Sequence, residues 1–355
     1  MRKSLLASLF AAGLGALLAQ PALAEKKDHF SVCWTIYAGW MPWEYGQAEG
    51  IVDKWAKKYG INIDVVQLND YVESINQYSA GQFDGCTMTN MDALTIPAAG
   101  GVDSTALIIG DFSNGNDGIV IKGENKTLAD LKGQNVNLVE LSVSHYLLAR
   151  GLERAKLTEK DLKVVNTSDA DMVAAFATDD VTAVATWNPL LAEIEATPKV
   201  SKVFDSSQIP GEIIDLMVVN SDTLKDNPEL GKALTGAWYE IMTIMKTDNA
   251  KGKAAREHMA KASGTDLAGY DAQLAATKMF YSAKDAVVFA NSPKLPATMT
   301  KVAEFSFSHG LLGEGAQSAE AIGMAFAKGI TTGDKGNIKL RFDPAFMQMA
   351  ADGKL

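Results

Sequence analysis

The chain has 355 residues, a formal net charge of −10 and two cysteines. This length suits two domains of ordinary size, each with its own hydrophobic core. An acidic chain without a basic run is a poor partner for nucleic acid or for an anionic membrane, so we exclude both.

The N-terminus has the three zones of a secretory signal peptide. Arg2 and Lys3 are basic, residues 5–18 are apolar, and a run of small residues ends at Ala24, just before the charged Glu25. The apolar run is too short to span a bilayer comfortably. We therefore expect cleavage after Ala24 and a soluble periplasmic protein.

An aromatic turn follows the first predicted strand. Residues 30–36 are β-branched and aromatic, as in a strand, and residues 44–59 carry apolar side chains at helical spacing. The loops beyond the carboxyl ends of strands bind ligands in open α/β sheets. We therefore expect the side chains of this turn to line a binding cleft, a place in the core being the alternative. They are Tyr37, Trp40, Trp43 and Glu44.

Strands and helices alternate along most of the chain, which predicts parallel, doubly wound sheets. The first alternation has strands at 30–37, 61–68, 83–88 and 104–110 and helices at 44–59, 71–80 and 91–99. Turn-forming residues then interrupt it, and a second alternation ends with a strand at 213–219.

We therefore expect an α/β protein with two doubly wound lobes, two crossover segments and a ligand cleft between the lobes. The signal peptide covers residues 1–24. The first lobe is expected to comprise 25–118 and 219–355, including the C-terminal helices, and the second lobe 119–218.

The two cysteines fall on strands that we expect to lie side by side in a 2-1-3 order. An exported protein can form disulfides, but directly adjacent strands seldom offer good bridging geometry. The sequence therefore leaves open whether Cys33 and Cys86 are bridged.

Several short motifs resemble one known family. They are the Lys132-Gly133 turn within 128–136, the strand start Phe83-Asp84-Gly85, and the return at 220–230 that contains Asn227-Pro228. Together with the signal peptide they resemble solute-binding proteins of ABC importers of the nitrate, sulfonate and taurine type, over nearly all of residues 28–290.

This resemblance implies a type II periplasmic binding protein fold, a small-molecule ligand, and a permease with its ATPase as partners. Within the family, residues 33–45 and 139–146 are most similar to the branch found with urea carboxylase, an enzyme whose substrate is thought to be guanidine.

Strand ends other than the aromatic turn add further candidate ligand contacts. They are Asn90, Asp92, Asp111, Glu140, Ser142, Trp187 and Asp215. The alternative for Asp92 is a helix cap, and for Trp187 a cover over the core. The set is acidic and aromatic.

A planar cation suits these residues better than an anion. The first arginine after the signal peptide is Arg150, inside a predicted helix, so guanidinium donors for a sulfonate are missing. Guanidinium itself offers N–H groups to carboxylates and a flat face to a tryptophan ring. We expect a guanidine binder. Urea or a related amide, another small amine, and less readily a sulfonate, nitrate or taurine held at the helix starts near Glu44 and Ser144 are the alternatives.

An enzyme is not expected. A thiamine-precursor synthase of the same superfamily carries a cysteine-rich motif, whereas this chain has two cysteines and four histidines in no metal-ligand spacing. We therefore expect no catalytic residue, no metal, no cofactor, and a monomer.

Overall fold

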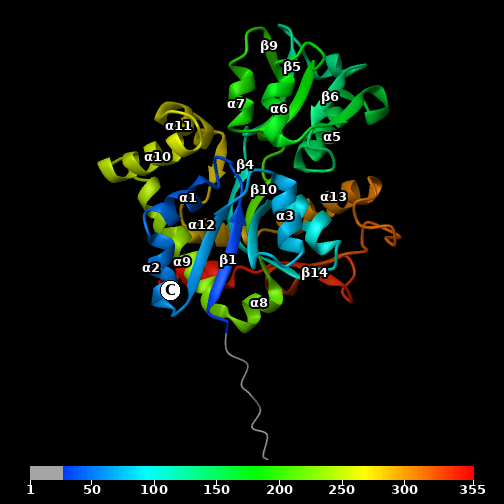
Figure 1. Ribbon diagram of the computed structural model, residues 1–355. Helices are drawn as coiled ribbons and strands as arrows, with labels where there is room; N and C mark the ends of the chain where they lie inside the picture. Colours follow the sequence, from blue (N-terminus) through cyan, green and yellow to red (C-terminus); the bar gives the residue numbers. More distant parts are fainter. Residues whose placement is uncertain (1–26) are drawn as a thin grey trace, which may run out of the picture.

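Two β-sheets organise the chain in the computed structural model, which describes residues 27–355 (Figure 1). The predicted signal peptide and its cleavage site lie outside the described residues. The larger sheet has nine strands in the order β13-β12-β14-β4-β10-β3-β1-β2, with β11 beside β4, and the smaller has five in the order β7-β6-β8-β5-β9. The predicted α/β class with two doubly wound lobes is confirmed.

The first lobe is built on the larger sheet. Its strands are β1 (His29–Trp34), β2 (Asn62–Gln67), β3 (Gly85–Thr89), β4 (Ser104–Ser113), β10 (Ile214–Asn220), β11 (Thr277–Met279), β12 (Gly323–Ala325), β13 (Thr331–Thr332) and β14 (Ile338–Phe342). Its helices are α1 (Met41–Ala48), α2 (Ile51–Lys58), α3 (Tyr71–Ser79), α4 (Asn90–Ala93), η1 (Leu94–Ala98), α8 (Ser221–Asp226), α9 (Pro228–Met245), α10 (Ala250–Ala262), α11 (Leu267–Ala275), α12 (Ala283–Ala290), α13 (Lys294–Ser308), η5 (Ala327–Gly329) and α14 (Ala345–Ala351).

The second lobe is built on the smaller sheet and lies above the first in Figure 1. Its strands are β5 (Asp117–Lys122), β6 (Asn135–Leu138), β7 (Lys163–Asn166), β8 (Ala183–Trp187) and β9 (Val200–Asp205). Its helices are η2 (Leu128–Leu131), α5 (Val143–Ala155), η3 (Glu159–Asp161), α6 (Asp169–Phe176), α7 (Leu190–Glu195) and η4 (Ser206–Gln208).

The chain crosses between the lobes twice, from β4 into β5 and from β9 into β10, as expected. The strand expected at 213–219, which was to close the second lobe, lies in the first sheet instead. As β10 it runs antiparallel between β3 and β4. Its continuous apolar run cannot by itself show to which sheet a strand belongs. This position brings the start of β10 beside the end of β4, at the junction of the two lobes.

The two cysteines are bridged. Strand β1 lies between β2 and β3, which confirms the predicted 2-1-3 order. Cys33 and Cys86 are register partners on β1 and β3, and they form a disulfide with their Cα atoms 4.4 Å apart.

The single helix expected at 44–59 is instead two helices. The chain turns at Gly50, whose φ of 67° lies in the left-handed region that favours glycine. The apolar spacing continued across the turn, so periodicity alone did not reveal the break. Among the described residues, no helix has both the length and the hydropathy needed to cross a membrane.

Trp43, expected at the cleft, lies in the core of the first lobe. Its side chain is 1% exposed, and its ring centre lies 5.1 Å from that of Trp238 on α9. Because α1 begins at Met41, one turn of helix carries this ring inward, away from the preceding aromatic turn.

Trp43→Ala should therefore lower the free energy of unfolding by about 3–5 kcal/mol, the usual effect of removing a core tryptophan. Urea unfolding followed by circular dichroism measures this. A variant as stable as wild type would show that the ring is not part of the core.

Candidate functional site

A small cavity lies between the two lobes at the crossovers. Residues of the first lobe, of the second lobe and of the returning segment all line it. They are Tyr37, Trp40, Tyr71 and Thr89, then Asp117, Val143 and Trp187, and finally Ile213 and Asp215. The space that the centre of a water molecule can occupy in this cavity is about 20 Å³. One water needs about 10–15 Å³ on this measure, so the cavity suits only a ligand of a few atoms.

Four aromatic rings form the wall. Tyr37 and Trp40 meet edge to face at 5.0 Å, Trp40 and Tyr71 are 5.8 Å apart, and Tyr71 meets Trp187 of the other lobe at 5.6 Å. The Tyr71–Trp187 contact closes the cavity across the two lobes. Within residues 27–355, the lysines and arginines that lie over aromatic faces use other rings. These four π faces are therefore not occupied by a protein cation.

Three aspartates meet at the crossovers. Asp215 on β10 and Asp111 on β4 are direct cross-strand partners, and Asp117 begins β5. All are at least 97% buried. Asp111 accepts a hydrogen bond from the Tyr37 hydroxyl at 3.1 Å. The carboxyl groups of Asp111 and Asp215 share a hydrogen bond, no other donor among the described residues reaches their Oδ2 atoms, and no described lysine or arginine lines the cavity.

Asp92 forms a fourth buried carboxyl group behind the aromatic wall. Its Oδ2 accepts from the Tyr71 hydroxyl at 2.7 Å and from the Thr89 hydroxyl at 2.8 Å. The backbone N–H of Val143, in the second lobe, also hydrogen-bonds this carboxyl group. Asp92 therefore holds the Tyr71 ring in place and links the wall to the second lobe.

Burial raises the pKa of every one of these carboxyl groups. The pKa of Asp92 rises to about 6 and that of Asp117 to about 7, mainly because burial disfavours the charged form. Burial, followed by repulsion from Asp111, raises the pKa of Asp215 well above its ordinary value. Burial likewise raises the pKa of Asp111. Among the described residues, these buried carboxyl groups thus have no positively charged side chain beside them to balance their charge.

Gly39 allows the aromatic turn to approach the acid cluster. A Cβ atom at this position would lie 2.4 Å from Asp111 Oδ2 and 2.6 Å from the Tyr37 ring. Only glycine leaves room for both groups. The turn predicted to bind ligand is therefore held against the carboxylates by a close backbone approach.

The structure brings together only part of the expected set. Tyr37, Trp40, Trp187 and Asp215 line the cavity, Asp111 lies directly behind it, and Asp92 supports its wall. Trp43 lies in the core, as described above.

The remaining expected residues lie elsewhere. Glu44 pairs with His258 on α10 at 2.8 Å. Asn90 holds the returning segment, accepting from the Ile214 amide and donating to the Glu212 carbonyl. Glu140 is exposed, and Ser142 caps α5 by accepting from the Ser144 amide at 3.2 Å. The side chains of Glu44, Asn90 and Ser142 are thus used in contacts within the protein, whereas that of Glu140 faces solvent.

The expected site set omitted five lining residues, namely Tyr71, Thr89, Asp117, Val143 and Ile213. Tyr71 and Thr89 also follow the carboxyl ends of strands, so the same criterion could have found them. Nothing in the sequence pattern distinguishes Val143 or Ile213 from ordinary core residues.

The described residues contain one group of side chains of the metal-binding type, outside this cavity. His145, Glu159 and His309 offer ligand atoms within 4.8 Å of one another. However, His145 Nδ1 accepts a hydrogen bond from the Leu141 amide at 3.1 Å. The proton of this imidazole therefore sits on Nε2, the atom that a metal would require. We conclude that the group is not built as a metal site.

Comparisons with known proteins place the chain in a family. Residues 53–245 match the family described as NMT1/THI5 like, which is more than half of the chain. The chain belongs to the NMT1/THI5-like family. The predicted resemblance at this level is confirmed.

Curated relatives of this NMT1/THI5-like chain match it over only part of its length. A binding protein of Brucella abortus is 25% identical over 181 residues, and the taurine-binding periplasmic protein of Escherichia coli is 22% identical over 181 residues. In both cases the match spans 50% of this chain and 56% of the relative.

Solved structures support the fold. The alkanesulfonate-binding protein of Xanthomonas axonopodis pv. citri bound to MOPS has a TM-score of 0.65 at 16% identity, covering 82% of this chain and 96% of that one. The periplasmic aliphatic sulphonate binding protein of E. coli has a TM-score of 0.67 at 17% identity, covering 81% and 94%. At such identities the likeness shows the periplasmic binding protein fold alone and does not identify the ligand.

The buried aspartates predict an unusual dependence of stability on pH. Their raised pKa values mean that the folded chain binds more protons than the unfolded chain between about pH 4 and pH 7. The free energy of unfolding of the ligand-free protein should therefore fall as the pH rises from 5 to 8. The expected loss is on the order of a few kcal/mol for each buried aspartate.

Melting temperatures across this range test the prediction. Asp111→Asn and Asp215→Asn should each flatten the profile, because an amide does not titrate, whereas Asp180→Asn, which changes an exposed carboxylate, should not. A melting temperature that is constant or rises with pH in the wild type contradicts the raised pKa values.

Proposed function

We propose that this protein is the extracytoplasmic solute-binding component of an ABC importer and that it captures a small nitrogen-rich cation, guanidinium above all, between its lobes. Family membership and the fold support the binding role, and the relatives named as binding proteins are consistent with it. A permease and its ATPase in the membrane are the implied partners, and the periplasm is the implied compartment.

The observation that carries the ligand class is the uncompensated acid cluster. Buried carboxylate oxygens without hydrogen-bond donors are costly, and native proteins rarely leave them so. Here the Oδ2 atoms of the cross-strand partners Asp111 and Asp215 have only each other's carboxyl group as hydrogen-bond partner, beside a wall of four aromatic rings. A cation with several N–H groups would supply both the missing charge and the missing donors.

Guanidinium matches each part of this site. Its N–H groups pair in plane with carboxylates, and its flat face stacks on tryptophan or tyrosine. The volume of about 20 Å³ leaves little room for anything larger. A sulfonate would face repulsion from three aspartates, and no described arginine or lysine lines the cavity to hold it.

The small size of the ligand limits its affinity. The ceiling of about −1.5 kcal/mol per non-hydrogen atom gives guanidinium about −6 kcal/mol. That free energy corresponds to a dissociation constant of about 40 μM. We therefore expect a dissociation constant of tens of micromolar at the tightest.

Urea is the second candidate, and one observation favours it. Trp40 Nε1 is buried without an acceptor among the described residues, and a cation cannot accept its hydrogen bond. The urea carbonyl could accept it. The two ligands differ in their pH dependence, because only the cation competes with protons for the aspartates.

Calorimetric titration of the mature protein tests the proposal. Guanidinium should bind at about pH 8 with the affinity given above, and more weakly as the pH falls through 7, because protonated aspartates lose their charge. Urea, taurine and nitrate should bind at least tenfold more weakly. Tight binding of taurine or nitrate without guanidinium binding would overturn the cation assignment, and tight, pH-independent binding of urea would select the second candidate.

Two substitutions locate the site. Trp40→Ala and Asp215→Asn should each weaken guanidinium binding at least tenfold, because one removes a stacking face and the other a charge partner. Glu140→Gln is the matched control, since Glu140 is a carboxylate shortly after the end of β6 but is exposed to solvent. Equal losses in the control and the two site variants would place the ligand elsewhere.

A further inference from the structure

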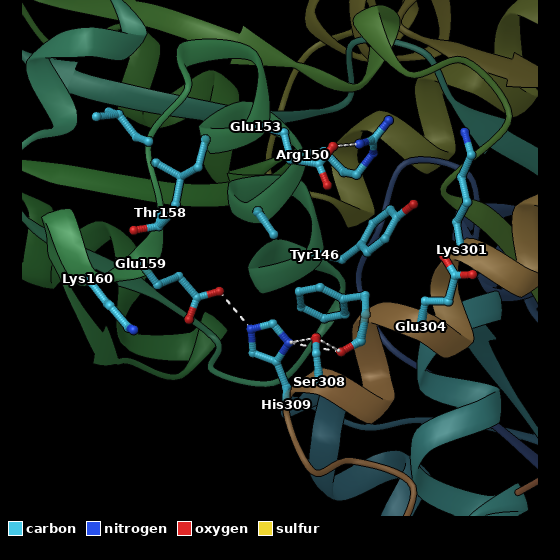
Figure 2. Close-up of a pocket in the computed structure, with 14 residues that line it drawn as sticks. Tyr146, Arg150, Glu153, Thr158, Glu159, Lys160, Lys301, Glu304, Ser308 and His309 are labelled. Atoms are coloured by element: carbon cyan, nitrogen blue, oxygen red, sulfur yellow. Dashed lines mark hydrogen bonds and ion pairs between the residues drawn. The ribbon is translucent and has the colours of Figure 1, made fainter. Parts of the chain in front are cut away.

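A second contact between the lobes lies outside the ligand cavity. A groove of about 650 Å³ is bounded by α5 and η3 of the second lobe and by α13 of the first (Figure 2). It shares no lining residue with the cavity described above. In Figure 2 the side chain of His309, at the end of α13, points to Glu159 of η3.

An ion pair joins the lobes in this groove. His309 Nε2 lies 2.7 Å from Glu159 Oε1, and both side chains are largely shielded from solvent, at 20% and 33% exposure. His145 of α5 approaches the other carboxylate oxygen, with Nε2 3.3 Å from Glu159 Oε2. One carboxylate thus lies between two imidazoles, one from each lobe.

Hydrogen bonds show which imidazole can carry a charge. His145 Nδ1 accepts from the Leu141 amide, so this nitrogen carries no proton. His309 Nδ1 lies 2.9 Å from the Phe305 carbonyl, which can only accept, and 3.0 Å from the Ser308 hydroxyl, which can donate or accept. Its Nε2 faces Glu159, whose pKa is lowered to about 2 by the hydrogen bonds from His145 and His309. A protonated His309 therefore donates from both nitrogens, to its own helix and to Glu159.

The position of His309 favours that charge. It is the C-terminal cap residue of α13, where the helix dipole stabilises a cation. Histidine is the side chain that ordinarily changes charge between pH 5 and pH 8. Without its second proton, His309 can no longer donate both to its own helix and to Glu159 of the other lobe.

A neighbouring ionic contact, which contains no histidine, also joins α5 to α13. Arg150 on α5 and Lys301 on α13 both pair with Glu212 in the returning segment, at 2.8 and 3.3 Å. Lys160 of η3 and Glu304 of α13 line the groove with opposite charges.

We propose that His309 and Glu159 form a proton-dependent latch, which holds the lobes closed while His309 is protonated and loosens as the pH rises through the range of histidine. Glu159 stays ionised throughout this range. Because its pKa is lowered, it loses its charge, and with it the ion pair, only in strong acid. The latch stands apart from the proposed ligand, since none of its residues lines the cavity. Like the stability that the buried aspartates contribute, the latch weakens as the pH rises.

The distance between the lobes in the ligand-free protein tests the latch. Spin labels on Glu124→Cys in the second lobe and Asp226→Cys in the first, both exposed, report open and closed populations by pulsed electron resonance, with the Cys33–Cys86 bridge intact. From pH 5.5 to pH 8.5 the ratio of closed to open molecules should fall about fivefold, the change expected for a partly exposed ion pair.

Variants assign the effect to the latch. His309→Gln should be less closed at pH 5.5 and far less sensitive to pH than wild type, and His309→Arg, with its permanent charge, should stay mostly closed at both pH values. His29→Gln is the matched control, because His29 pairs with Asp64 within the first lobe and both are exposed. It should behave as wild type.

Three results would overturn the latch. They are a ligand-free wild type that is open at pH 5.5, an equal pH dependence in wild type and His309→Gln, and closure at pH 8.5 that requires added zinc and is lost with a chelator. Because no ligand is present, each result is independent of whether guanidinium binds.

Discussion

The burial of several carboxyl groups without a compensating positive charge is the constraint on which the rest of the structure depends. Asp111, Asp117 and Asp215 all lie where the chain passes from one sheet to the other. Burial there disfavours their charge and raises their pKa values. The ligand-free protein can relieve this cost only by binding protons, and a cation could relieve it instead. Stability, ligand choice and lobe closure are thereby linked at one position.

The proposed ligand class differs from the ligands for which relatives of this chain are named. The E. coli relatives are named for taurine and aliphatic sulfonates, whereas the cavity in this chain is acidic and aromatic. The two-lobed architecture provides a cleft that can close, and a few side chains at the crossovers determine which ligand binds in it. Gly39 and Tyr37 show how local this choice is, because one missing Cβ lets the aromatic turn reach Asp111.

The sequence predicted the fold class, the two crossovers and the neighbouring β1 and β3 strands, because periodicity and turn formers are local signals. It predicted the site in part. Trp43 and Glu44 belong to the same aromatic turn as Trp40, yet the first turn of α1 directs them toward Trp238 and His258. Strand β10 was assigned to the other lobe because an apolar run does not reveal its partner strands. The register between distant strands decides which carboxylates lie close together, as for Asp215 and Asp111. A local sequence pattern does not contain this information.

Proton release on ligand binding tests the central claim most directly. Guanidinium is titrated into the protein at pH 6.5 in buffers of different ionisation enthalpy, so that the observed heats give the number of protons exchanged. If the buried aspartates are the counter-ions of the ligand, binding should release protons at pH 6.5 and release far fewer at pH 8.5. Binding with no proton release at either pH, or proton uptake, would contradict the account, because the cation would then not replace the protons of Asp111, Asp117 and Asp215.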